Sequence, residues 1–122
     1  MYQLSVEEHF DAAHLLRDYH GKCENTHGHR FKVVIRLEAT KLQQNGLAYD
    51  FTLLKLSLRE ALARYDHAFL NEIAPFDIIE PSCENIAATL YDELLPQFTG
   101  LPVTLTHVEI WESPSTGVSY SR

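Results

Sequence analysis

HGHRFKVVIRLEA, at residues 27–39, decides the fold class, because apolar and polar side chains alternate along it almost without a break. Charged residues occupy most positions of one parity. From residue 31 onward the other parity is apolar: Phe31, Val33, Ile35, Leu37 and Ala39. Successive side chains of a β-strand point to opposite faces of its sheet, so this pattern predicts a long strand with one buried face.

Shorter alternating stretches lie on both sides of this strand. Residues 2–10 predict a strand before it, and a polar loop rich in histidine connects the two. Residues 103–112 and 118–120 predict two more strands, separated by a turn over 113–117. Within each pair the connection is too short for a crossover, so the two strands must pair antiparallel.

Between the two strand pairs, apolar residues recur at helical spacing. They predict one helix over about 52–65, with Asp50 in its N-cap region, and a second helix that begins near Ser82 and ends at Pro96. The element order ββααββ predicts an α+β fold, with a four-stranded antiparallel sheet and both helices on one face. At this length the chain should form a single domain over residues 1–122.

Composition restricts the class of function. The formal net charge of −7 argues against a nucleic-acid-binding protein, and no apolar run approaches the roughly 20 residues of a membrane span. The N-terminal sequence MYQLSVEEHF is acidic and alternating, unlike a signal peptide. We therefore expect a cytoplasmic protein that binds neither nucleic acid nor membrane. In that compartment Cys23 and Cys83 should be free thiols rather than a disulfide.

The histidines suggest a metal site. His27 and His29 stand two apart on a predicted strand, so both can leave the same face and converge on one ion. His14 follows the strand that should pair with theirs, and three neutral histidines form an open zinc site of the catalytic kind. Cys23 as a fourth ligand would instead close a structural site. Five of the seven histidines fall within the first thirty residues: His9, His14, His20, His27 and His29.

Six short motifs, taken together and in order, resemble the 6-pyruvoyltetrahydropterin synthase superfamily over nearly the whole chain. They are FDAAH (10–14), KCENTHGH (22–29), DF (50–51), DHAFLN (66–71), PSCEN (81–85) and WES (111–113). The resemblance implies the tunnelling fold of that superfamily. It also implies that the histidines matching His14, His27 and His29 hold Zn²⁺, and that the cysteine matching Cys23 is the catalytic base and not a ligand.

Cys23 itself lies in a polar stretch between Lys22 and Glu24, where a cysteine is more often exposed and reactive than structural. A nearby zinc ion and Lys22 would favour its thiolate, which can act as a general base near neutral pH. Asp66 and His67 resemble the residues that complete a Cys–Asp–His proton relay, with His67 exchanging protons and Asp66 fixing its tautomer. Without the resemblance, an Asp–His pair after a helix is often only a pair of charges favoured by the helix C-terminus, with no catalytic role.

The remaining candidates concern recognition of the pterin ring. Glu112 resembles the pterin anchor, and its parity on the strand differs from that of Glu109. As the anchor it belongs to the recognition end of the site, away from the zinc; otherwise it is a solvated strand end. Ser82, Cys83 and Glu84 resemble further pterin contacts, although Ser82 alone can be an N-cap and Glu84 a partner of the helix dipole.

The spacing between Cys23 and the HGH motif is similar to that of the bacterial 6-carboxytetrahydropterin synthases of queuosine precursor synthesis. The resemblance then implies a lyase that removes triphosphate and a two-carbon aldehyde from 7,8-dihydroneopterin triphosphate. One alternative is a 6-pyruvoyltetrahydropterin synthase, which keeps the three-carbon chain; another is an inactive zinc-binding scaffold. The resemblance also implies trimers paired as a homohexamer, and long open strand edges independently favour a homo-oligomer.

Overall fold

Two long antiparallel strands form the centre of the sheet. In the computed structural model, which describes residues 1–17 and 27–122, β1 (Tyr2–His14) pairs with β2 (His27–Ala39) along its whole length. Tyr2 lies opposite Ala39, and His14 lies opposite His27. The first strand was expected to end at residue 10. It continues to His14 because the ladder extends without interruption to the start of β2.

The sheet has five strands in the order β3-β1-β2-β4-β5. β4 (Thr104–Ser113) pairs antiparallel with β2, and β5 (Thr116–Ser121) pairs antiparallel with β4. The expected sheet of four antiparallel strands therefore needs one correction, because β3 (Ala68–Phe69) adds a short parallel pair beside β1. Two residues are too few to show alternation, so the sequence pattern could not predict this strand.

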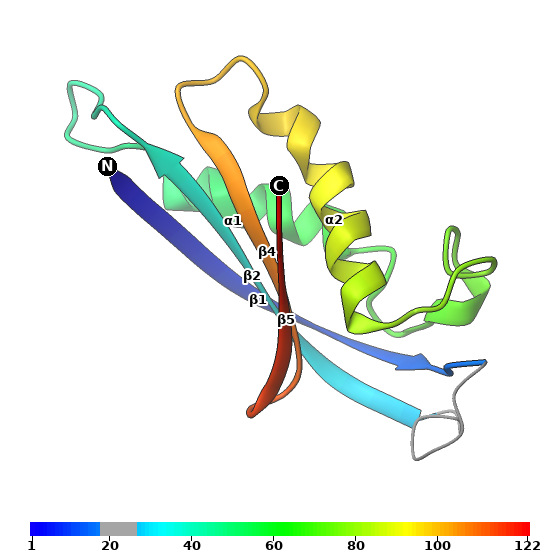
Figure 1. Cartoon of the computed structure of the whole chain (residues 1–122). Helices are drawn as coiled ribbons and strands as arrows, with labels where there is room; N and C mark the ends of the chain where they lie inside the picture. Colours follow the sequence, from blue (N-terminus) through cyan, green and yellow to red (C-terminus); the bar gives the residue numbers. More distant parts are fainter. Residues whose placement is uncertain (18–26) are drawn as a thin grey trace.

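Both helices cover the same face of the sheet, which confirms the α+β architecture (Figure 1). The Asp50 side chain caps α1 (Phe51–Leu62) by accepting a hydrogen bond of 2.8 Å from the backbone N–H of Thr52. A short 3₁₀ helix, η2 (Leu70–Glu72), precedes α2 (Cys83–Phe98). Pro96 does not end α2 as expected, because the helix continues to the buried Phe98. None of the helices in the described ranges is long and apolar enough to span a membrane.

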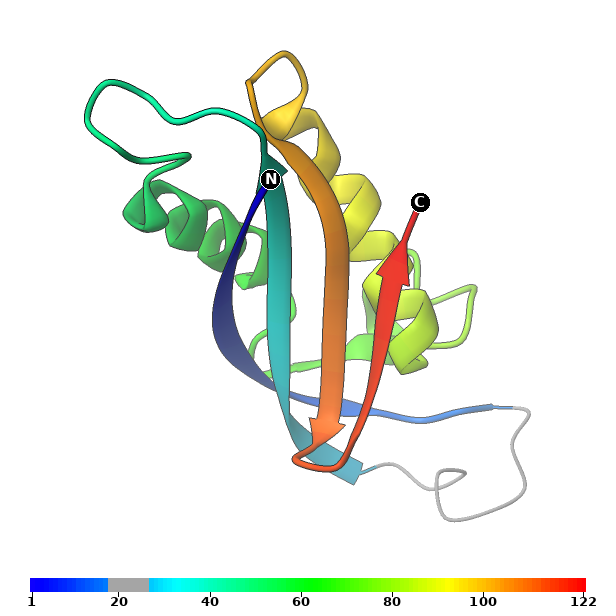
Figure 2. The same cartoon turned by 60° about the vertical axis from the view of Figure 1, so that its left-hand side comes forward.

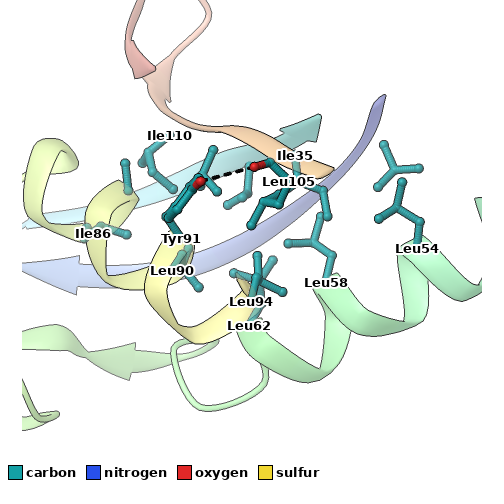
Figure 3. Close-up of a cluster of buried hydrophobic side chains, with 14 of the residues drawn as sticks. Ile35, Leu54, Leu58, Leu62, Ile86, Leu90, Tyr91, Leu94, Leu105 and Ile110 are labelled. Atoms are coloured by element: carbon teal, nitrogen blue, oxygen red, sulfur yellow. Dashed lines mark hydrogen bonds between the residues drawn. The ribbon is translucent and has the colours of Figure 1, made fainter. Parts of the chain in front are cut away.

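The core lies between the helices and the sheet (Figure 3). Each large aliphatic side chain buried there contributes on the order of 1.5–3 kcal/mol relative to exposure. The Tyr91 hydroxyl donates a hydrogen bond of 3.1 Å to the Leu105 carbonyl and so ties α2 to β4. The fully buried residues of the two helices and the sheet include Leu54 and Leu58 of α1, Ile86, Leu90 and Leu94 of α2, and Ile35, Val108 and Ile110 of the sheet.

This packing brings several chain segments to one end of the sheet. The end of β1, the start of β2 and the hairpin between β4 and β5 lie together there (Figure 2). The N-terminus of α2 reaches the same end, since the Pro81 carbonyl lies within hydrogen-bonding distance of the His14 ring. The fold therefore gathers four separate parts of the sequence around His14.

Gly117 allows a close approach between β5 and the single tryptophan. It lies opposite Trp111, and a Cβ added at residue 117 would stand 2.4 Å from an indole carbon. The indole is held by a 3.0 Å hydrogen bond from Nε1 to Glu109, with the Lys32 ammonium 5.1 Å from the centroid of the ring. A side chain at residue 117 would therefore have to displace a ring that is fixed on two sides.

We expect Gly117→Ala to lower the free energy of unfolding by about 1–3 kcal/mol, the usual cost of overpacking. Urea denaturation followed by tryptophan fluorescence measures this loss. Gly28→Ala is the matched control, because the nearest atom to its added Cβ lies 4.0 Å away, at ordinary contact distance. Equal unfolding midpoints for Gly117→Ala and the parent chain would contradict the steric argument.

Candidate functional site

His14 ends β1 and is almost completely buried, with 2% of its surface exposed. Its Nδ1 atom lies 2.9 Å from the Pro81 carbonyl oxygen. A carbonyl only accepts hydrogen bonds, so Nδ1 carries the proton and the neutral ring has its lone pair on Nε2. A histidine whose second nitrogen is fixed in this way is oriented as metal-binding histidines usually are.

His29 lies on β2 opposite Ala12, on the same side as the buried Phe31. Its ring packs edge-on against Phe31 with centroids 5.6 Å apart, and against His14 at 5.2 Å. The strand parity predicted for His29 is therefore confirmed. The backbone of His27 pairs with that of His14, while the side chain of His27 lies outside the described residues.

Glu112 brings a carboxylate to these histidines from the end of β4. Its Oε1 atom lies 2.8 Å from His29 Nε2 and 3.7 Å from His14 Nε2. The sequence predicts Glu112 at the pterin end, away from the metal, but the structure places it against both histidines. The three residues form a group whose possible ligand atoms all lie within 4.8 Å of one another. Two histidines and a carboxylate are a donor set that catalytic zinc sites use, so the residues fit Zn²⁺.

The N-terminus of α2 completes a cavity of about 400 Å³ next to this group. Such a volume is within the range of small-molecule sites. Ser82 accepts a hydrogen bond of 3.2 Å from the backbone N–H of Asn85, so it is the N-cap of α2. The buried Cys83 has its Sγ atom 3.9 Å from Glu112 Oε2. The residues that line this cavity include His14, Ser82, Cys83, Glu84 and Glu112.

Asp66 and His67 lie on an exposed rim beside β1, and they do not line this cavity. The backbone N–H of Asp11 donates to Asp66 Oδ1 at 2.9 Å, and His67 Nδ1 lies 3.1 Å from the same oxygen. The hydrogen bond from Asp11, followed by the charge of His67, holds the pKa of Asp66 below its usual range. His67 has a positive φ of 58°, a conformation that non-glycine residues seldom adopt.

Two features of the site were not predicted from sequence. One is the Pro81 carbonyl that orients His14, and the other is the approach of Glu112 to the histidines. Both depend on how α2 and β4 pack, and the only signal for the first was the PSCEN motif itself. Cys23, the expected base, lies outside the described residues.

Glu109 lies on the opposite face of β4, as its parity predicts. It accepts hydrogen bonds from Arg36 Nε at 2.7 Å and from Trp111 Nε1 at 3.0 Å. Partial burial alone would raise the pKa of Glu109, but these two hydrogen bonds together hold it below its usual value. A carboxylate with a depressed folded-state pKa stabilises the fold above its unfolded pKa. That contribution is lost as the pH falls through the folded value.

We therefore expect Glu109→Gln to lower the free energy of unfolding at pH 7 by about 1–2 kcal/mol, allowing for the partial exposure of the Arg36 pair. The difference from the parent chain should shrink as the pH falls through the lowered pKa of Glu109 in the folded protein, because the carboxyl then takes up a proton. Urea denaturation at a series of pH values measures it. Glu60→Gln, on the exposed side of α1, is the control for loss of one negative charge. A difference that is the same at every pH would contradict the assignment.

Comparison with known proteins adds to this geometry. Residues 3–122 match the family model described as 6-pyruvoyl tetrahydropterin synthase. A putative 6-carboxy-5,6,7,8-tetrahydropterin synthase of Archaeoglobus fulgidus is 37% identical over 91 residues, covering 75% of this chain and 74% of the relative. The 6-carboxy-5,6,7,8-tetrahydropterin synthase of Bacillus subtilis is 29% identical over 126 residues, covering 98% of this chain and 84% of the relative.

Among solved structures, the 6-pyruvoyl tetrahydropterin synthase of Caenorhabditis elegans is similar, with a TM-score of 0.88. It is 24% identical in sequence, and the match covers 99% of this chain and 95% of that one. At that identity the likeness shows a shared fold. The family model, by contrast, spans nearly all of the sequence, so the chain belongs to the 6-pyruvoyl tetrahydropterin synthase family.

Proposed function

We propose that the protein is a 6-carboxy-5,6,7,8-tetrahydropterin synthase of queuosine precursor synthesis. It would convert 7,8-dihydroneopterin triphosphate and one water molecule to 6-carboxytetrahydropterin, acetaldehyde and triphosphate. The observation that carries the proposal is the meeting of His14, His29 and Glu112 beside one cavity, in a chain whose curated relatives bear this name.

The metal would be Zn²⁺, held by His14, His27 and His29. Support comes from the hydrogen bond between His14 Nδ1 and the Pro81 carbonyl, which directs Nε2 toward His29 and Glu112. When bound, Zn²⁺ supplies Lewis acidity toward hydroxyl groups of the substrate side chain. The chain's own contribution at this point is to hold the rings of His14 and His29 in place through Phe31 and the Pro81 carbonyl.

The pterin ring would lie in the cavity beside α2. It presents a ring N–H and an exocyclic amino group side by side, and one carboxylate can accept both. Glu112 would be that carboxylate, because of the two acidic residues that line the cavity, Glu84 and Glu112, it is the one that lies beside His14 and His29. Ser82, Cys83 and Glu84 line the same space and would contact the ring edge.

Proton transfer would be carried out by Cys23 as the base, with His67 returning protons. The 3.1 Å contact between His67 Nδ1 and Asp66 Oδ1 supports a fixed tautomer for His67. Because Asp66 and His67 lie on an exposed rim outside the cavity, they would complete the site of a neighbouring subunit rather than their own.

Assembly into trimers, paired as a homohexamer, would bring these residues together. β5 forms one edge of the sheet, and on the other edge β3 covers only Ala12 and Ala13 of β1. Such open edges favour strand pairing between subunits. We expect light scattering at micromolar concentration to give the mass of a hexamer, and a monomer would contradict this arrangement.

Incubation with dihydroneopterin triphosphate tests the function directly. We expect zinc-loaded protein to release acetaldehyde and triphosphate in equal amounts, and the product mass to show the carboxyl group. Release of triphosphate without acetaldehyde would identify the 6-pyruvoyl product instead. Release of neither compound would favour an inactive zinc-binding scaffold.

A further inference from the structure

We infer that Asn71 is a positioning residue of the metal site, because its side-chain amide holds the backbone directly after His14 and so fixes the direction of the His14 ring. Asn71 closes the DHAFLN motif, of which the proposed proton relay uses only Asp66 and His67. The inference rests on the proposed function in one respect, namely that His14 binds Zn²⁺. Asn71 takes part in no chemical step and acts only through the chain.

Asn71 belongs to η2 and bonds to both polar groups of the Leu15 backbone. Its Oδ1 atom accepts a hydrogen bond of 2.9 Å from the Leu15 N–H, and its Nδ2 atom donates one of 2.8 Å to the Leu15 carbonyl. Only one orientation of the side-chain amide makes both bonds, since oxygen accepts and nitrogen donates. The Leu15 N–H is part of the peptide group that follows the His14 Cα, so holding it restricts the ψ angle of His14.

The chain leaves the sheet directly after His14. In the part of the chain that the structure describes, the ladder between β1 and β2 ends at the pair of His14 and His27. Beyond that pair, β1 continues beside η2 and the N-terminus of α2 (Figure 1). The backbone N–H of Arg17 donates a hydrogen bond of 2.8 Å to Glu80 Oε2. Residues 15–17 are therefore held by η2 and by the segment that joins it to α2.

The partner of the His14 ring is held as well. The Pro81 carbonyl lies 2.9 Å from His14 Nδ1, and the peptide group directly before Pro81 carries the Glu80 carbonyl. That carbonyl accepts a hydrogen bond of 2.9 Å from Asn85 Nδ2, in the first turn of α2. The ring and the carbonyl thus meet between two restrained segments, one fixed by Asn71 and the other by Asn85.

A fixed ring favours metal binding because the ion then meets a ligand atom that is already in place. A ring that samples several directions must be ordered when the ion binds, and the lost conformational freedom lowers the affinity. The possible ligand atoms of His14, His29 and Glu112 lie within 4.8 Å of one another. A rotation of the His14 ring would therefore remove one donor from a group that is otherwise assembled.

Two roles for Asn71 give different results. If Asn71 only stabilises the fold, its replacement lowers the free energy of unfolding and leaves the zinc affinity of the folded protein unchanged. If Asn71 positions His14, the zinc affinity of the folded protein falls as well. Urea denaturation of the zinc-free chain measures the first quantity. Chelator competition under native conditions measures the second, and the visible spectrum of the Co²⁺-loaded protein reports the geometry of coordination.

Asn71→Ala removes both bonds to Leu15. Loss of an outer partner of a metal-binding histidine typically costs 10–100-fold in metal affinity, and Asn71 acts one residue away from the ligand, so we expect about 10-fold weaker zinc binding. The cobalt spectrum should also change. Asn71→Leu refills the space of the amide but makes neither bond, so it should lose as much zinc affinity as Asn71→Ala. Recovery of the parent affinity in Asn71→Leu would assign the effect to packing and overturn the inference.

Tyr91→Phe is the matched control. It also removes a hydrogen bond from a side chain to a backbone group, the 3.1 Å bond to the Leu105 carbonyl, and Tyr91 does not line the cavity beside His14. We expect Tyr91→Phe to unfold at a lower urea concentration than the parent chain while matching it in zinc affinity and cobalt spectrum. A loss of zinc affinity as large as that of Asn71→Ala would make the effect one of general stability and overturn the inference.

The inference and the proposed function fail in different ways. Equal zinc affinity and equal cobalt spectra in Asn71→Ala and the parent chain would overturn the inference alone. A parent chain that binds no zinc would refute the proposed metal, and the inference with it. If the zinc results hold but no acetaldehyde is released from dihydroneopterin triphosphate, the proposed activity fails while the role of Asn71 stands.

Discussion

His29→Ala should lose most of its bound zinc while keeping its fold. A zinc site worth about 10–16 kcal/mol, shared among three ligands, loses roughly 3–5 kcal/mol with one of them, which is about 10² to 10⁴-fold in affinity. His29 stands near the start of β2 and outside the buried core cluster, so alanine should leave the packing of the helices on the sheet intact. Metal analysis of the purified variant, together with its circular dichroism spectrum, measures both effects.

Variants of the other histidines make this result specific. His14→Ala and His27→Ala should lose zinc in the same way, whereas His107→Ala should retain it. His107 is the control because its Nδ1 atom contacts Thr106 on β4, outside the histidine and glutamate group. Full zinc content in His29→Ala would remove it from the ligand set. Loss of zinc in His14→Ala and His29→Ala but not in His27→Ala would leave Glu112 as the third ligand.

The fold was predictable where side-chain periodicity is long enough to be seen. The alternation of residues 27–39 and 103–112 identified β2 and β4, and the helical spacing after Asp50 identified α1. The sequence did not predict β3, because a strand of two residues is too short to show alternation of apolar and polar side chains. The end of α2 was misplaced because Pro96 is a strong local signal, and burial of Phe98 outweighs it.

The sequence predicted which face of its strand each described site residue occupies, but not the distances between these residues. Parity placed His29 beside Phe31 and set Glu112 apart from Glu109, which pairs with Arg36 on the other face. It could not give the distance between Glu112 and His29, because that depends on how the end of β4 lies beyond the last pair of the ladder, Lys32 with Trp111. Parity could not give the contact between the His14 ring and the Pro81 carbonyl either, because that contact depends on how the N-terminus of α2 packs against β1.

Cys23→Ala should keep its zinc and lose turnover by about 10² to 10⁴-fold, the usual contribution of a general base. The stretch that carries Cys23 leaves β1 after His14 and returns at His27, and these two residues are paired in the sheet. Cys23 is four residues before His27 in the sequence, and the prediction rests on its proposed role as the base. The measurements are zinc content and the rate of acetaldehyde release.

The two roles considered for Cys23 give opposite results. As a fourth ligand in a closed structural site, its replacement would lower zinc affinity and remove the thiolate-to-metal absorption of the cobalt-loaded protein. As a base, its replacement leaves both unchanged, and Cys23→Ser should be nearly as slow as Cys23→Ala because a serine hydroxyl does not ionise near neutral pH. Cys83→Ala is the matched control for loss of a thiol. Its sulfur contacts Glu112 at 3.9 Å, so we expect a higher KM with kcat largely retained. Loss of zinc in Cys23→Ala would therefore refute the catalytic assignment.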